Sequence, residues 1–110
     1  MPQFTVYRNK SSRSKSTFPF LVDVQSDLLE QLQTRVVIPL TRTAGVAKRP
    51  LSQLTPALTF DGDSYVLMTP QLAGVARSEL GAPAGSLAEE RNAIIAAMDF
   101  LLTGYSLLPS

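Results

Sequence analysis

Two pairs of neighbouring carboxylates are the side chains best placed for proton-transfer chemistry in this 110-residue sequence. Asp61 and Asp63 flank a glycine, and Glu89 lies next to Glu90. A pair of carboxylates can supply a general acid and a general base. However, Asp-Gly between apolar runs is typical of a hairpin turn, and carboxylates at a helix start offset the helix dipole. We therefore interpret both pairs as structural.

A third acid, Asp23, lies inside an apolar segment, and Arg35 lies beside another. An acid and a base buried in this way can form an ion pair, and such pairs more often serve structure than catalysis. The sequence thus allows a buried Asp23–Arg35 pair with a structural role.

Several residue types and motifs that enzymes use are absent. The sequence has no cysteine and no histidine, so it lacks thiolate ligands, the usual zinc ligand and the side chain that most readily titrates near neutrality. It also has no phosphate-binding glycine loop and no nucleophile elbow. We expect a protein that is not an enzyme, with no cofactor and no metal. The lack of cysteine, of a secretory signal pattern and of a long apolar run predicts the cytoplasm.

Charge is distributed unevenly along the chain. Residues 1–50 carry eight of the 10 basic side chains and three of the nine acidic ones, and no acid precedes Asp23. Four of the bases occur in or beside a serine-rich stretch that predicts an exposed loop, namely Arg8, Lys10, Arg13 and Lys15. This loop would attract an acidic partner, either nucleic acid or protein. Alternatively, the charges only keep the loop soluble.

Alternating apolar residues and β-branched runs predict the strands that carry these side chains. The expected strands are 3–7, 18–25, 34–40, 57–60, 64–68 and a short one over 71–77. We expect the first two to pair as a hairpin and the third to end or reach an edge at Pro39, which cannot donate to a ladder. One helical turn is expected around Leu51 to Leu54, and residues 81–85 are expected to form a flexible connection.

A helix is predicted from about Leu87 to Leu102. Ser86 and Glu89 fit a capping box at its start, and Gly104 is suited to the left-handed residue at its end. Its apolar residues form one stripe expected to face the core: Leu87, Ile94, Ile95, Met98, Leu101 and Leu102. Because the opposite face is also apolar, we expect a second subunit or a partner to cover it. The alternative is an ordinary core helix with exposed alanines. Together the elements predict a mainly β fold, a small, strongly twisted antiparallel barrel with the helix across it.

The order of several segments resembles the CcdB toxins of toxin–antitoxin modules. The segments are Phe4 to Tyr7, Leu21 to Leu29 with the block VDVQSD, Val36 to Leu40, Asp61 to Thr69, Leu72 to Val75, and Arg91 to Gly104. The similarity spans residues 3–105. It implies one toxin domain over residues 1–105, an SH3-like barrel that forms a homodimer, and residues 106–110 as a tail.

The resemblance also implies a function. CcdB toxins bind the A subunit of DNA gyrase and trap the enzyme on cleaved DNA, without making or breaking a bond themselves. The residues implied to contact gyrase are Leu28, Leu29, Asp99, Leu102, Thr103, Gly104 and Tyr105. A cognate antitoxin would fold onto the toxin, and DNA would be contacted only through that complex. We expect Arg8, Lys10, Arg13 and Lys15 to meet the antitoxin.

Two alternatives follow from the same sequence. The related MazF and Kid toxins are endoribonucleases, and without histidine such a protein would need arginine and carboxylate chemistry. A chromosomal homologue that binds an antitoxin but is not toxic is the other alternative. It rests on the carboxyl terminus, where family toxins often end at Trp-Gly-Ile or Thr-Gly-Ile but Tyr105 is followed here by five more residues.

Overall fold

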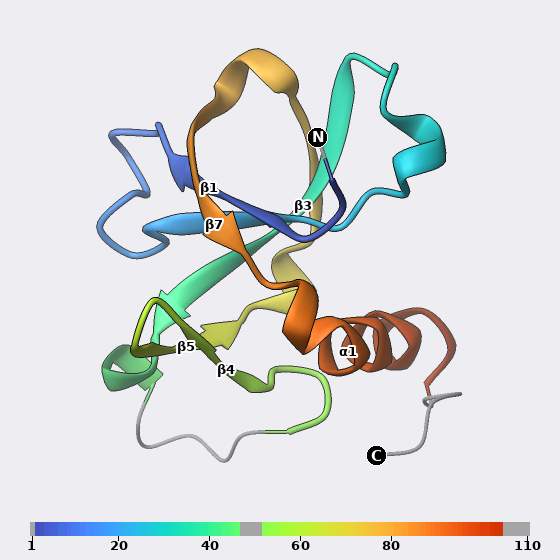
Figure 1. The fold of residues 1–110 in the computed structure, drawn as a ribbon. Coiled ribbons are helices and arrows are strands. Elements are labelled where there is room, and N and C mark those ends of the chain that lie inside the picture. Colours follow the sequence, from blue (N-terminus) through green and yellow to red (C-terminus); the bar gives the residue numbers. More distant parts are fainter. Residues whose placement is uncertain (1, 47–51, 105–110) are drawn as a thin grey trace.

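The computed structural model describes residues 2–46 and 52–104, which form one curled antiparallel sheet and one carboxyl-proximal helix (Figure 1). The strands are β1 (Thr5–Asn9), β2 (Phe20–Asp23), β3 (Thr34–Arg42), β4 (Ala57–Phe60), β5 (Asp63–Leu67), β6 (Ala73–Ala76) and β7 (Leu80–Ser86). Their order is β4-β5-β3-β2-β1-β7, and β6 pairs with β3. The sheet curls into a half-barrel, which confirms the predicted mainly β fold with a carboxyl-proximal helix.

Cross-strand pairing places alternate apolar residues on the face that forms the core. Val6 pairs with Val22, and Val22 pairs with Ile38 on the next strand. All three side chains are fully buried. Such aligned apolar pairs set the register, because a slip of one residue would turn each of them toward solvent. The predicted hairpin of β1 and β2 is confirmed.

The turn between β4 and β5 has the backbone that its sequence predicts. Asp61 and Gly62 have φ angles of 52° and 83°. Two consecutive positive φ values are characteristic of a type I′ turn, whose twist matches that of the flanking strands. The predicted Asp-Gly hairpin is therefore confirmed, and Asp61 and Asp63 belong to the turn and the strand that follows it.

The prediction that the third strand ends or reaches an edge at Pro39 is wrong. Strand β3 continues to Arg42 and is central in the sheet. Along its length β3 changes partner: pairing with β6 ends at Val37, and pairing with β5 begins at Leu40. Pro39 lies between these two ladders, where no N–H is required, and its carbonyl accepts the Met68 N–H at 2.9 Å.

Residues 81–85 are not the flexible connection that their glycines and proline suggested. They lie within β7, which pairs with β1 from Thr5 opposite Ser86 to Asn9 opposite Leu80, with register shifts on both sides of Tyr7. Gly81 permits the close approach, because a Cβ there would lie 2.5 Å from the Arg8 carbonyl oxygen. Gly81 is therefore needed for the close packing of β7 against β1, and it does not make this segment flexible.

Short 3₁₀ turns connect the strands. They are η1 (Asp27–Leu29), η2 (Thr43–Val46), η3 (Thr69–Gln71), η4 (Arg77–Glu79) and η5 (Ala88–Glu90). The single helical turn expected at Leu51 to Leu54 is not found where it can be checked: residue 51 lies outside the described residues, and residues 52–54 are not helical.

Helix α1 (Arg91–Thr103) begins four residues later than predicted, after η5. The predicted capping box does not form: the Ser86 hydroxyl accepts the Ala88 N–H at 3.1 Å, and the residue that precedes the helix is Glu90. The predicted helix end is confirmed. Gly104 has a φ of 82°, and its N–H donates to the Phe100 carbonyl.

Helix α1 buries only part of the predicted stripe. Leu87 and Ile94 are buried, and Ile95 and Met98 are half-buried against the core, as expected. Leu101 and Leu102 are 38% and 75% exposed, so the prediction that they face the core is wrong. The last turn of α1 lies at the periphery of the molecule in Figure 1, where the sheet no longer covers it.

Candidate partner-binding surfaces

The last turn of α1 is an exposed apolar surface, which we call the helix tip (residues 99–104). Phe100 and Leu101 are each 38% exposed, and Leu102 is 75% exposed. The Thr103 hydroxyl donates to the Asp99 carbonyl at 2.7 Å, within the helix itself. A cluster of large exposed apolar side chains on a small protein is typical of a binding surface.

Gly104 ends the helix tip with open space around it. Among the described residues, no heavy atom lies within 4 Å of the position that a Cβ would occupy there, so what requires glycine at this position is its positive φ. Tyr105, the last residue implied to contact gyrase, lies outside the described residues.

A second exposed apolar surface lies on and just after η1, and we call it the leucine turn (residues 26–32). Leu28 is 93% exposed, and Leu29 and Leu32 are about half exposed. Leu28 has almost its entire side-chain area available for a partner. Burying a leucine side chain contributes about 1.5–3 kcal/mol. A partner that covers these leucines would therefore gain binding free energy from each of them.

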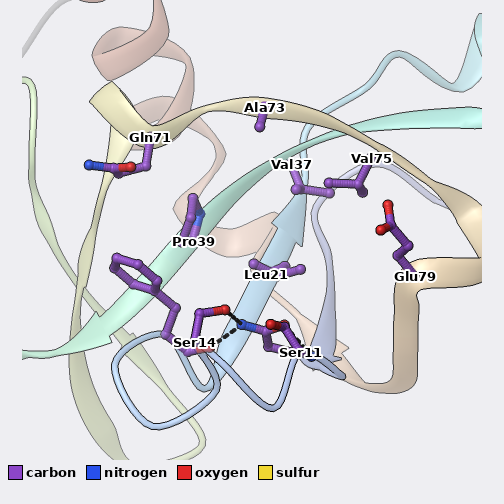
Figure 2. Close-up of a pocket in the computed structure, with 11 residues that line it drawn as sticks. Ser11, Ser14, Leu21, Val37, Pro39, Gln71, Ala73, Val75 and Glu79 are labelled. Atoms are coloured by element: carbon purple, nitrogen blue, oxygen red, sulfur yellow. Dashed lines mark hydrogen bonds between the residues drawn. The ribbon is translucent and has the colours of Figure 1, made fainter.

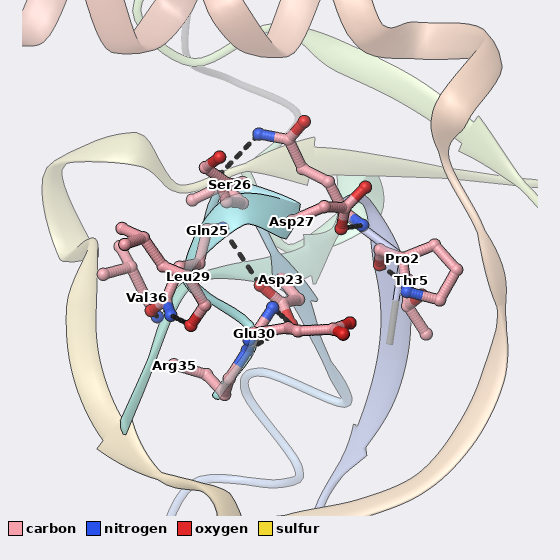
Figure 3. A network of polar contacts seen from close by, with 12 residues as sticks. Pro2, Thr5, Asp23, Gln25, Ser26, Asp27, Leu29, Glu30, Arg35 and Val36 are labelled. Carbon is pink, nitrogen blue, oxygen red and sulfur yellow. Dashed lines mark hydrogen bonds and ion pairs between the residues drawn. The ribbon is translucent and has the colours of Figure 1, made fainter. Parts of the chain in front are cut away.

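The polar residues of the VDVQSD block hold the leucine turn in place (Figure 3). The Ser26 hydroxyl accepts the Leu28 N–H at 3.1 Å and caps η1. The Gln25 side chain donates to the Leu29 carbonyl at 2.9 Å and accepts the Val36 N–H at 3.0 Å. These bonds join the turn to β3, so the exposed leucines are presented by a braced backbone.

The same block ties the turn to the start of β1. The Asp27 carboxylate accepts the Gln3 N–H at 2.7 Å, and the Gln3 side-chain amide donates to the Val24 carbonyl at 2.9 Å. Beneath them, Asp23 and Arg35 form the ion pair that the sequence allowed. Arg35 Nε and Nη2 each lie 2.8 Å from Asp23 Oδ2, and the two side chains are 1% and 0% exposed.

Burial explains the role of this ion pair. Asp23 Oδ1 accepts the Gln25 N–H at 3.0 Å, so the carboxylate orients the segment that leads into the leucine turn. A pair so completely enclosed cannot reach a substrate. Its position confirms the structural interpretation of Asp23 and Arg35.

The structure does not bring the helix tip and the leucine turn together. In Figure 1 the turn (cyan) lies at the upper right and the red end of α1 lies well below it, at the lower right. The residues implied to contact gyrase therefore form two separate patches on one protomer.

The basic loop, residues 10–18, lies on the side of the molecule away from the helix tip (Figure 1). Arg13 and Lys15 are exposed, as predicted. The other two bases are partly engaged within the protein: Lys10 Nζ donates to the Ser78 carbonyl at 2.9 Å, and the Arg8 guanidinium lies 5.8 Å from the centre of the Phe20 ring.

An apolar cavity of about 210 Å³ lies between the basic loop and β6. Figure 2 shows Leu21, Val37 and Pro39 from β2 and β3 facing it, with Val75 across from them. Ser11 and Ser14 border it on the loop side, and Glu79 lies at the η4 end. The lining is therefore mostly apolar, and Glu79 is the one charged residue among those that line it.

Comparison with known families decides the class of protein. The family model described as CcdB protein matches residues 3–104 of the chain. The chain belongs to the CcdB family. The CcdB family comprises gyrase-targeting toxins of toxin–antitoxin modules, and the half-barrel with its carboxyl-proximal helix is consistent with the CcdB fold. The resemblance seen in the ordered segments is confirmed.

Sequence reasoning missed several residues of the two apolar patches. Leu101 and Leu32 are exposed leucines that no sequence pattern separated from core leucines. Gln3 and Gln25 carry bonds that hold the leucine turn. Gln25 lies in the VDVQSD block, whereas no sequence pattern indicated Gln3.

Within the described residues, no group of three or more metal-ligating side chains comes together, and no helix is long and apolar enough to cross a membrane.

Proposed function

We propose that this protein binds the A subunit of DNA gyrase and traps the complex of gyrase with cleaved DNA, acting as a homodimer that a cognate antitoxin neutralises. The proposal rests on membership of the CcdB family together with one observation on this chain. That observation is the exposed helix tip, whose leucines and phenylalanine remain uncovered although the protomer has a complete core.

The helix tip suits insertion into a protein partner. Leu102 offers most of its side chain to a partner. The hydroxyl of Thr103 is already bonded within the helix, so docking would not bury it without a hydrogen-bond partner. Gly104 ends the helix without a side chain that would obstruct an approaching surface. Interfaces of this kind depend on a few well-packed apolar anchors.

The leucine turn supplies the second part of the proposed contact. Leu28 and Leu29 project from a backbone that five hydrogen bonds from Ser26, Gln25, Asp27 and Gln3 hold. A braced turn loses little conformational freedom when it binds, which favours affinity. Because the two patches lie apart on one protomer, a homodimer would present two copies of each to the dimeric gyrase subunit.

Binding to purified gyrase A subunit tests the proposal. We expect Leu102→Ser to weaken binding about 30-fold or more, the effect of losing one anchor of about 2 kcal/mol. The variant should unfold at the same urea concentration as the wild type, because Leu102 is outside the core. Absence of wild-type binding to gyrase would contradict the proposed target.

Ala82→Ser is the control, because Ala82 is an exposed apolar residue of β7 that lies outside both patches. It should leave gyrase binding within about twofold of the wild type, as expected for a neutral surface change. A loss equal to that of Leu102→Ser would contradict the residue assignment. A gyrase cleavage assay then separates binding from trapping, because only a trapped complex of gyrase and cleaved DNA makes linear DNA accumulate.

For the antitoxin we propose the basic loop, with Arg8, Lys10, Arg13 and Lys15, and the adjoining apolar cavity. All four are exposed, but Lys10 and Arg8 also make contacts within the protein, so replacing Arg13 and Lys15 by serine should remove most of the salt-sensitive part of the affinity. The change of Arg8 and Lys10 should have a smaller effect. Unchanged affinity when all four are serine would exclude this surface.

An endoribonuclease would need a carboxylate and an arginine that can reach RNA. Asp23 and Arg35 form such a pair, and their enclosure disfavours that chemistry at this position. Incubation of the purified protein with messenger RNA tests this directly, since sequence-specific cleavage would contradict a mechanism based on binding alone.

A further inference from the structure

The second half of the leucine turn is held by a residue that is distant in sequence. Strand β6 pairs with β3 as far as Thr34, which lies opposite Ala76. The next backbone bond continues this ladder, because the Arg77 N–H donates to the Gln33 carbonyl at 2.9 Å. The Arg77 guanidinium reaches further along the turn, where its Nη2 donates to the Glu30 carbonyl. One residue of the connection between β6 and β7 therefore bonds two carbonyl groups of the connection between β2 and β3.

The bond to Glu30 closes the carboxyl end of η1. The last carbonyl groups of a helical turn have no partner within that turn, and a basic side chain near its end can bond them. Turn η1 has no basic residue of its own, and Glu30 is the residue that follows it. Arg77 supplies the missing donor from η4, and a charged donor makes a stronger hydrogen bond than a neutral one. The turn is thus bonded at its start by Gln25 and Ser26 (Figure 3) and at its end by Arg77.

The exposed leucines depend on these bonds for their position. Leu28 is 93% exposed and Leu29 is half exposed, so packing against the core does not hold either side chain. Arg77 is exposed as well and does not belong to the hydrophobic core. Losing its bond should therefore loosen the turn locally without unfolding the protein, as expected where exposed hydrogen bonds hold a segment that has few buried contacts.

From these contacts we infer that Arg77 is a positioning residue for gyrase binding, which acts by holding the leucine turn in the conformation that presents Leu28 and Leu29. This inference rests on the proposed function, in which the two leucines contact the A subunit. A turn that is already ordered loses less conformational freedom on binding, whereas ordering a loose turn lowers the affinity. Arg77 itself need not contact gyrase.

NMR relaxation of the full chain without gyrase tests whether Arg77 holds the turn. Arg77→Gln shortens the side chain and removes its charged donor. It should lower the backbone order parameters of residues 28–32 from about 0.85, typical of rigid backbone, toward about 0.6, typical of flexible backbone. Arg77→Lys keeps a charged donor on a long side chain and should retain most of the order. The urea midpoint of both variants should equal that of the wild type, because Arg77 lies outside the core.

Arg91→Gln is the matched control for the loss of one positive charge. Arg91 is an exposed arginine at the start of α1, the opposite end of the helix from the helix tip. Its replacement should leave the order parameters of the turn unchanged. A loss of order in the turn equal to that in Arg77→Gln would show that charge alone is responsible, and would overturn the inference.

Binding to purified gyrase A subunit tests the consequence for function. Arg77→Gln should weaken binding about fivefold, the effect expected from ordering a loose segment on binding. Arg77→Lys and Arg91→Gln should bind within about twofold of the wild type. In a protein that already carries Leu28→Ser, the Arg77→Gln change should weaken binding by less than about twofold, because the turn then has less to present.

Two results would overturn the positioning role. One is a set of order parameters that does not change in Arg77→Gln. The other is an undiminished fivefold effect of Arg77→Gln in the Leu28→Ser protein, which would mean that Arg77 acts independently of the turn. Failure of the wild type to bind gyrase would instead contradict the proposed function, and the order parameters, measured without gyrase, would still decide whether Arg77 holds the turn.

Discussion

Replacing Asp23 by asparagine removes one charge from the buried ion pair and keeps nearly the same shape. Asparagine retains an oxygen that can accept the Gln25 N–H, so the change isolates the charge. It leaves the Arg35 guanidinium enclosed at 1% exposure without its anion. Breaking a buried pair in this way typically costs about 3–5 kcal/mol, so we expect Asp23→Asn to lower the free energy of unfolding by about 3 kcal/mol.

Urea unfolding followed by circular dichroism measures this loss. With a slope of about 1–3 kcal/mol per molar urea for a protein of this size, the midpoint should fall by about 1–3 M. Wild type and variant must be compared at one protein concentration, because a homodimer unfolds in a concentration-dependent way.

A second variant distinguishes loss of the pair from loss of packing. Asp23→Leu combined with Arg35→Met replaces both charges by apolar groups and should be more stable than Asp23→Asn, since no charge stays buried alone. The two positions should couple strongly in a double-mutant cycle. A loss below about 1 kcal/mol in Asp23→Asn would refute the reasoning, as it would mean that Arg35 is hydrated or paired elsewhere.

Three further changes are predicted. Gly104→Glu should abolish gyrase binding yet cost only about 1 kcal/mol of stability for its positive φ; growth arrest equal to that of the wild type in cells expressing it would contradict this. Gly81→Ala should destabilise the protein by about 1–3 kcal/mol because its Cβ meets the Arg8 carbonyl, whereas Gly74→Ala has open space and should change stability little; equal urea midpoints for the two would refute the packing argument. Tyr7 has a raised pKa in the folded state, so the stability that it contributes is complete below the unfolded tyrosine pKa of about 10 and is lost as pH rises from there toward the folded pKa. The Tyr7→Phe variant should lack this alkaline loss, and an identical pH profile would contradict it.

Patterns with a local physical cause were predicted well. The Asp61-Gly62 turn, the β1–β2 hairpin and the end of the helix at Gly104 all depend on a few adjacent residues and their φ preferences. The family resemblance also followed from short ordered segments. These features need no knowledge of what the chain packs against.

Features set by distant segments were missed. Residues 81–85 have the composition of a flexible connection, yet β1 supplies hydrogen-bond partners that make them a strand. Pro39 ends strands on local grounds, but β3 passes from β6 to β5 at that point and tolerates it. In each case a neighbour far away in sequence satisfies the backbone, and local patterns cannot contain that information.

Residue types by themselves determined that this chain carries apolar surface in excess of one small core and that Asp23 could pair with Arg35. Only the tertiary structure decided which leucines are covered. Helical periodicity places Ile94 and Leu101 on one stripe, but the sheet covers the first and ends before the second. Burial depends on where the partner surface stops, a property of the assembled fold that spacing along the chain does not specify.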